Sequence, residues 1–139
     1  MLGTIPKINW KSVFGGDYRT VEKHIVYARA LANTNVTAWV NAMDVFNDWL
    51  LAALYRHDPS IGKYQLGHIG SVLSGGRLKK KYPDVYALVD DIHARRLESA
   101  LSHPTTKQTG KPTKPIKWSY FKTGKKLLRA AIRELAAKW

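Results

Sequence analysis

Apolar residues recur every three to four positions through two long stretches of the first half of the chain. The first stretch, 18–32, has an apolar side made of Tyr18, Val21, Ile25, Ala28 and Ala32. The second, 36–57, has a stripe made of Val36, Trp39, Val40, Met43, Phe46, Leu50 and Leu54. This period is typical of amphipathic helices. The pattern therefore predicts two consecutive helices.

Residues that favour helix ends bound both stretches. Asp17 is placed to cap the first helix, and the polar run 33–35 stops it. The second helix begins at Asn35 or Thr37. It ends at 58–59, Asp-Pro, because proline disfavours the helical conformation in the residue before it.

The second half of the chain predicts three more helices. A short one lies near 64–73 and is ended by the Gly-Gly pair at 75–76, and a basic turn follows at 77–83. Pro83 suits the first turn of a helix that runs to about 102 and ends before Pro104. The last helix covers 118–138. Its apolar arc comprises Phe121, Leu127, Leu128, Ala131, Ile132, Leu135 and Trp139.

Together these patterns indicate an all-α protein, because no stretch alternates convincingly between apolar and polar residues. We expect an antiparallel helical bundle of four main helices plus one short helix. An irregular N-terminal arm, 1–16, would precede a single domain at 17–139. That domain would carry a loop at 103–117 rich in lysine, threonine and proline.

Composition narrows the function. The net charge is +13, and residues 61–139 hold seventeen Lys and Arg against five Asp and Glu. Such an excess favours a polyanionic partner, most often nucleic acid. The absence of cysteine excludes disulfides and thiolate chemistry and fits a cytoplasmic protein. No apolar run is long enough to span a membrane, the first 20 residues lack the core of a secretion signal, and no pattern indicates a cofactor or a metal site.

Two basic groups are candidates for contact with phosphates. The loop carries Lys107, Lys111, Lys114 and Lys117, which either follow a phosphate backbone or form a solvated linker. The last helix carries Lys122, Lys125, Lys126, Arg129 and Arg133. These five lie within about 100° of one another on a helical wheel, and the single acid of that helix, Glu134, falls outside the arc. A charged arc is either the solvated side of the helix or the seat of an anion.

The helix that starts at Pro83 changes character near its end. Its core stripe is Val85, Leu88, Val89 and Ile92, and the same side continues into Arg96, Ser99 and His103. A buried arginine needs a partner. Arg96 therefore pairs with Asp44 or Asp48 of another helix, or holds an anion or a partner chain. Asn47 is also unexpected, because it lies inside the apolar stripe of 36–57 and a buried amide needs hydrogen bonds.

Arg96 and His103 together suit chemistry on RNA. The arginine would hold a phosphodiester while the histidine, near a helix C-terminus, moves a proton at the ribose 2′-hydroxyl. Ser99 would add a hydrogen bond. The structural alternative is equally simple: Arg96 bridges to an acid, and His103 caps carbonyl groups before Pro104.

The spacing Arg96-x6-His103 in a small helical domain resembles the HEPN family of helical-bundle ribonucleases. That resemblance implies a metal-independent endoribonuclease of a toxin or phage-defence system, with two copies of the motif meeting in a dimer cleft. Arg96 would stabilise the phosphate and His103 would act as acid or base, with Ser99 and Asn47 as supporting polar residues. Leu97 stands where the family often has a polar residue.

Two functions therefore compete. The first is RNA cleavage at Arg96 and His103. The second is binding without catalysis, in which the basic residues seat nucleic acid for a polymerase, a reverse transcriptase or another ribonucleoprotein. Both predict a nucleic-acid partner, with RNA favoured. The wide apolar arc of the helix from 85 also indicates a homodimer or a protein partner.

Overall fold

The computed structural model describes residues 8–32, 34–61, 69–97 and 116–139. Within these ranges the α-helices are α1 (Trp10–Phe14), α2 (Tyr18–Ala32), α3 (Val36–His57), α4 (Ile69–Ser74), α5 (Arg77–Lys81), α6 (Pro83–Leu97) and α7 (Tyr120–Lys138), and the 3-10 helices are η1 (Gly15–Asp17) and η2 (Pro59–Ile61). No strand occurs among these residues. The all-α prediction is confirmed.

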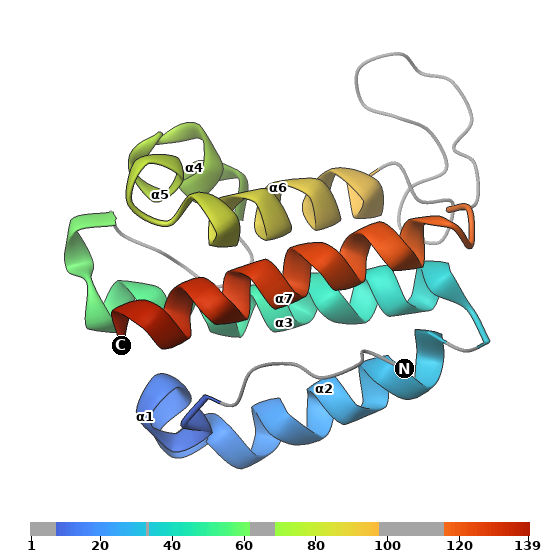
Figure 1. The fold of residues 1–139 in the computed structure, drawn as a ribbon, viewed down its shortest axis with the longest axis horizontal. Coiled ribbons are helices and arrows are strands. Elements are labelled where there is room, and N and C mark those ends of the chain that lie inside the picture. Colours follow the sequence, from blue (N-terminus) through green and yellow to red (C-terminus); the bar gives the residue numbers. More distant parts are fainter. Residues whose placement is uncertain (1–7, 33, 62–68, 98–115) are drawn as a thin grey trace.

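The four long helices form a bundle around α3 (Figure 1). Helix α2 runs antiparallel to α3, α6 lies on another side of α3 and is also antiparallel to it, and α7 runs antiparallel to α6. In the view of Figure 1, α7 lies in front of α3 and turns its other side to the viewer. The short helices α4 and α5 pack beside the first half of α6.

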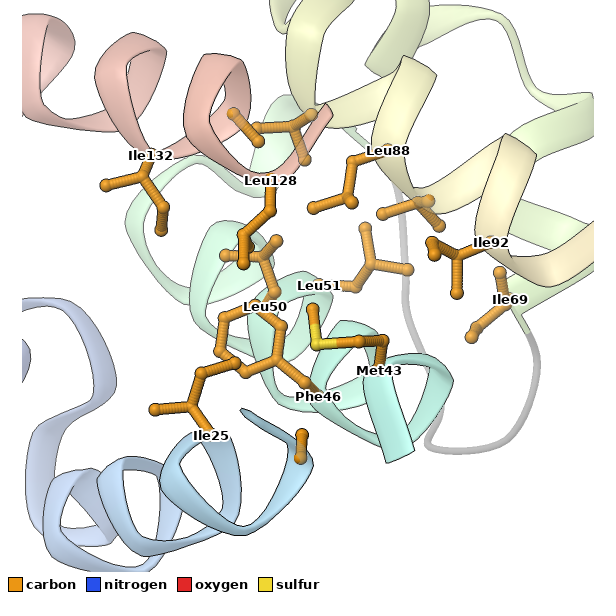
Figure 2. Packing of buried hydrophobic residues seen from close by; sticks show 14 of the residues in the cluster. Ile25, Met43, Phe46, Leu50, Leu51, Ile69, Leu88, Ile92, Leu128 and Ile132 are labelled. Atoms are coloured by element: carbon orange, nitrogen blue, oxygen red, sulfur yellow. The ribbon is translucent and has the colours of Figure 1, made fainter. Parts of the chain in front are cut away.

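The core fills the space between α3 and its neighbours (Figure 2). Phe46 and Leu50 of α3 meet Ile25 of α2, while Leu88 of α6 and Leu128 of α7 close the other sides. All except Ile25 are at most 1% exposed. The periodic stripe of α3 is therefore the centre of the molecule, as its continuous apolar side predicts.

Helix α3 begins where its sequence indicates. The side chain of Asn35 accepts a hydrogen bond of 3.1 Å from the backbone N–H of Ala38, which satisfies one of the free amides of the first turn. Its other end is closed by the Asp58 backbone N–H, which donates to the Leu54 carbonyl. The predicted bounds of α2 and α3 are both confirmed.

One glycine sets how closely α7 approaches α3. A Cβ at Gly124 would lie 2.4 Å from the ring of Trp39, which is fully buried. The Trp39 ring also meets Phe121 edge-on, with ring centroids 5.0 Å apart. A glycine inside a helix costs about 0.5–1 kcal/mol relative to alanine. The close crossing of the two helices explains why α7 carries one at this position.

The predicted irregular arm at 1–16 is wrong for its second part, where the chain forms α1. The Asn9 side chain caps this helix by accepting from the Ser12 backbone N–H at 3.1 Å. Val13 and Phe14 are buried, and Trp10 stacks on Phe14. This small apolar cluster holds α1 against α2 and α3. Residues 1–7 lie outside the described residues.

The predicted basic turn at 77–83 is also wrong, because Arg77–Lys81 is helical. Leu78 is fully buried and anchors this helix, while its lysines stay exposed. Gly76, with φ of +75°, supplies the left-handed residue before it. The short helix expected at 64–73 is described only from Ile69 to Ser74, and the last part of the helix expected to reach 102 lies beyond the described residues.

Ionic contacts tie together the end of the bundle where α3 and α7 finish. Lys81 donates to Asp58 at 2.7 Å, and Ser60 and Tyr82 donate to the same carboxylate. Hydrogen bonds from Lys81 above all, and from Ser60, hold the pKa of Asp58 well below its usual range, while burial raises the pKa of Tyr82. We call Asp58, Ser60, Lys81 and Tyr82, together with Glu134 and Lys138 of α7, the anchored end.

Glu134 of α7 belongs to the anchored end as well. Its Oε2 accepts the backbone N–H of Val85 at 2.8 Å, so α7 caps the first turn of α6. Its Oε1 lies 3.7 Å from Lys138. The side chain is only 6% exposed. Both carboxylate oxygens of the single acid of α7 therefore contact other residues of the fold.

Candidate nucleic-acid interface

The outward side of α7 carries the predicted basic arc. Its inward side is buried through Phe121, Gly124, Leu128, Ala131, Ile132 and Leu135. The cations occupy the opposite side because residues three or four apart share a face of a helix. We call the set Lys122, Lys125, Lys126, Arg129 and Arg133 the cationic face.

The members of the cationic face differ in their surroundings. Lys122, Lys126 and Arg133 are exposed, and their side chains have no hydrogen-bond or ionic partner in the described part of the chain. Lys125 and Arg129 are half-buried and take part in further interactions. The Lys125 ammonium lies 5.2 Å from the centre of the Phe121 ring.

Of the four predicted loop cations, only Lys117 lies within the described residues. Lys117 is exposed just before α7, and its carbonyl accepts from the Tyr120 backbone N–H at 3.0 Å. Lys107, Lys111 and Lys114 lie outside the described residues. Whether the loop cations continue the cationic face therefore stays a prediction.

The start of α7 is held on α6 by a partly buried polar contact. The Tyr120 hydroxyl donates to the Asp91 carboxylate, and the guanidinium of Arg95 lies 5.0 Å from the centre of the Tyr120 ring. Burial, and then the hydrogen bond to Asp91, raise the pKa of Tyr120 far above its usual range. The hydroxyl therefore stays protonated and continues to donate at any neutral pH.

An exposed aromatic ring lies just before the cationic face in the sequence. Trp118 is 55% exposed and lies in the turn just before α7. Its ring stacks on Phe121 with centroids 5.5 Å apart and planes 30° apart. Sequence reasoning did not select this residue. The available signal was a tryptophan directly after Lys117, at the end of a basic loop.

Arg96 pairs with Asp44, one of the two acids that the sequence offered. The closest atoms, Nη1 and Oδ2, are 3.4 Å apart. His93, one helical turn earlier on α6, approaches the same carboxylate through Nδ1 at 3.2 and 3.3 Å. The Asp44 side chain is 6% exposed and that of Arg96 is 39% exposed. We call these three residues the Asp44 cluster.

The cluster joins the middle of α3 to the end of α6. It gives a structural reason for a polar residue on the inner side of α6, since a buried carboxylate needs charged or hydrogen-bonding partners. The other predicted members of the catalytic group, Ser99 and His103, lie outside the described residues. Their distance from Arg96 stays a prediction.

Asn47 lies on α3 one turn after Asp44 and is fully buried. Neither its Nδ2 nor its Oδ1 has a hydrogen-bond partner in the part of the chain that the structure describes. The sequence placed this amide correctly inside the apolar stripe. A side chain without exposed surface does not contact RNA, so any role of Asn47 in catalysis would be indirect.

Metal-ligating side chains and clefts are the other candidate features of the described ranges. They contain no group of three or more His, Asp or Glu side chains that could hold a metal ion. A cleft of about 220 Å³ lies between α1 and the end of α7, beside Ser12 and Trp139. It falls below the usual range of ligand pockets, about 300–1,000 Å³. A larger hollow of about 540 Å³ lies on α2 beside Arg19, Glu22, Lys23 and Val26. All four residues belong to one helix, so this hollow is open surface and not an enclosed site.

Comparison with known proteins adds no further assignment. No protein-family model matches this chain, and neither curated proteins nor solved structures give a match.

Proposed function

We propose that the protein binds nucleic acid, with RNA favoured, through the cationic face of α7. The observation that carries this proposal is a group of three exposed cations, Lys122, Lys126 and Arg133, on one side of a helix whose only acid is turned into the anchored end. A row of cations without interleaved acids is unfavourable by itself. A bound polyanion removes that repulsion.

The positions of the cations suit a phosphate backbone. From Lys122 to Arg133 the helix rises about 16 Å, with a cation on each successive turn. A nucleic-acid strand offers one negative charge at each nucleotide, so a row of this length meets several phosphates. The face can therefore hold a strand without any base-specific contact.

A membrane surface is the competing anionic partner. A helix that lies on a membrane inserts its apolar side between the lipids. In α7 that side is the inner wall of the core, with Leu128, Ile132 and Leu135 each about 1% exposed. No helix in the described segments is long and apolar enough to cross a bilayer. The face consequently suits a polyanion that needs charge alone.

Charge reversal tests the proposal. The triple variant Lys122→Glu, Lys126→Glu and Arg133→Glu should weaken binding to a labelled RNA at least about 100-fold at 0.1 M salt. These three residues are chosen because none of their side chains has a partner within the described part of the fold. The slope of log affinity against log salt should also become shallower by about 2.

A matched control keeps the same change in net charge. Lys11, Arg19 and Lys23 are exposed on α1 and α2, and their reversal to Glu leaves the cationic face intact. This control should lose much less affinity than the α7 variant. Equal losses in the two triples would mean that net charge and not the cationic face attracts the RNA, and the proposal would be wrong.

A second candidate is metal-independent cleavage of the bound RNA, as the HEPN resemblance implies. One observation favours it: Arg96 keeps 39% of its side chain exposed although it contacts Asp44, so its guanidinium still has a surface open to a phosphate. His103 would supply the proton transfer, with Ser99 beside it. In this second proposal His93 and Asp44 hold the arginine in place.

Cleavage is tested on labelled RNA in excess EDTA. Activity should persist in EDTA and disappear in both Arg96→Ala and His103→Ala. Arg95→Ala is the control, because Arg95 neighbours Arg96 but lies over the Tyr120 ring. If RNA stayed intact at concentrations where the native protein binds it, the cleavage proposal would be wrong and only the binding function would remain.

A further inference from the structure

We propose that the nucleic acid on the cationic face is single-stranded and that one of its bases stacks on Trp118. The inference rests on the proposed binding function and specifies its substrate. It starts from the exposed ring at the beginning of α7, which sequence reasoning did not select.

Trp118 is a fixed platform and not a loose side chain. Its carbonyl accepts from the Phe121 backbone N–H at 3.0 Å, so the turn that carries it continues into α7. Its ring stacks on Phe121, and Phe121 in turn meets the fully buried Trp39 edge-on. The three rings form a continuous column from the surface to the core. The outer ring is therefore held in place before any ligand arrives.

The column leaves a large apolar surface open to solvent. Phe121 takes one contact of the Trp118 ring, yet 55% of the residue stays exposed. Bases stack favourably on exposed aromatic rings, and this interaction tolerates any base because every base has a π-face. The open surface has the chemistry of a base-stacking site.

The cations next to Trp118 identify what is stacked. Lys117 directly precedes Trp118, and Lys122 follows four residues later in the first turn of α7. The Lys125 ammonium lies 5.2 Å from the centre of the Phe121 ring on which Trp118 stacks, so a cation of the cationic face lies beside the same aromatic column. Phosphates and one base of the same strand can thus be contacted together. Bases inside a duplex are already stacked on each other, so this arrangement favours unpaired nucleotides.

A fluorescence anisotropy titration with the full chain tests the inference. The probes are a labelled single-stranded RNA of about a dozen nucleotides, within the usual site size, and a blunt duplex of the same sequence. The native protein should bind the single strand more tightly. Trp118→Ala should weaken that binding about 5- to 100-fold and leave duplex binding unchanged. Its salt slope should stay the same, because no phosphate contact is lost.

Two further variants separate stacking from folding. Trp118→Phe keeps an aromatic ring and should retain most of the affinity, whereas Trp118→Leu covers Phe121 with an apolar side chain and should behave like Trp118→Ala. Tyr27→Ala is the matched control, since Tyr27 is 58% exposed on α2 away from the cationic face. It should bind like the native protein.

Three results would overturn the inference. They are equal affinity of the native protein for duplex and single strand, unchanged single-strand affinity in Trp118→Ala, and a change in oligomeric mass in Trp118→Ala with RNA binding intact. The last would assign the ring to a protein contact. The charge-reversal triple variant tests the binding function separately, because it leaves Trp118 unchanged.

Discussion

The anchored end and the cationic face use the same residue types in opposite ways. At the anchored end Lys81 lies 2.7 Å from Asp58, and Lys138 lies 3.7 Å from Glu134. On the cationic face Lys122 and Lys126 have no such partner in the described part of the chain. Both regions involve α7. The cationic face therefore leaves Lys122 and Lys126 available to a ligand, whereas Lys81 and Lys138 at the anchored end are already paired.

The difference between the two regions also has a cost in stability. Like charges four residues apart on a helix destabilise it by about 0.2–0.5 kcal/mol per pair. Lys122 and Lys126, which have no ionic partner in the described part of the chain, form one such pair. The anchored end stabilises the fold through its charges, while the cationic face opposes it. Substitutions in each region can separate these effects, beginning with the contact that holds α7 in place.

Gly124→Ala should have the largest effect on stability, because it disturbs the attachment of α7 without altering a charge. The new Cβ would lie 2.4 Å from the enclosed Trp39 ring. Overpacking costs about 1–3 kcal/mol and occasionally more, and so short a contact with a fully buried ring lies at the upper end of that range. The loss therefore outweighs the gain of about 0.5–1 kcal/mol in helix propensity. Urea unfolding measures the difference.

The control for this prediction is Gly70→Ala in α4, where a Cβ meets no atom within 4 Å. That variant should be as stable as the native protein or more so. If Gly124→Ala were equally well tolerated, the close crossing of α3 and α7 would not determine the position of the cationic face.

Glu134→Ala should come next, with a loss of about 1.5 kcal/mol in the free energy of unfolding. The Val85 amide would lose its charged acceptor, and Lys138 would lose its ionic partner. Glu134→Gln keeps an acceptor and should lose less. Both variants should bind RNA at least as well as the native protein while folded. Weaker binding by the folded variants would show that the anchored end contributes to the interface.

Asp58→Asn should have a smaller effect, about 1 kcal/mol or less at neutral pH, and change the response to acid. Lys81 holds the pKa of Asp58 below its ordinary value, about 3.9. The native contact therefore stabilises the protein fully above that pH and is lost as the pH falls below about 4. The stability of Asp58→Asn should vary less with pH between about 4 and 2. Parallel pH profiles in urea unfolding would contradict the assignment.

Neutralising the exposed cations of α7 should have the smallest effect on folding. The triple variant Lys122→Gln, Lys126→Gln and Arg133→Gln should stay within about 0.5 kcal/mol of the native protein or gain slightly. Salt should stabilise the native protein more than the variant, because it screens a repulsion that the variant lacks. A clear loss of stability would mean that these cations belong to the fold, like those of the anchored end.

The sequence predicted the long helices well because their determinants are local. The bounds of α2 and α3 follow from apolar periodicity and from breakers such as Asp58 and Pro59. Helix α1 was missed because Gly15 and Gly16 made its surroundings look irregular, although Asn9 offered a capping signal. Helix α5 was missed because a single apolar residue among lysines gives no periodic pattern. The residue that anchors this helix is the buried Leu78.

The candidate sites were predicted only in part because their contacts join distant segments. Helical spacing alone placed the cationic face and turned Arg96 inward. Spacing did not decide between Asp44 and Asp48 as its partner, since that choice depends on how α3 and α6 are aligned. The Trp118 column has no local pattern either, because Phe121 supports it only after Trp39 has been positioned by the core.

The cap that Glu134 provides to α6 also bears on how the chain folds as it is made. The Val85 amide and its acceptor are 49 residues apart in the sequence. While the protein is being synthesised, the Val85 amide therefore lacks this acceptor until α7 has left the ribosome. Helices α2 and α3 can pair earlier, because their contacts are close in sequence. A chain synthesised only as far as α6 would therefore pair α2 with α3 before the first turn of α6 receives its cap.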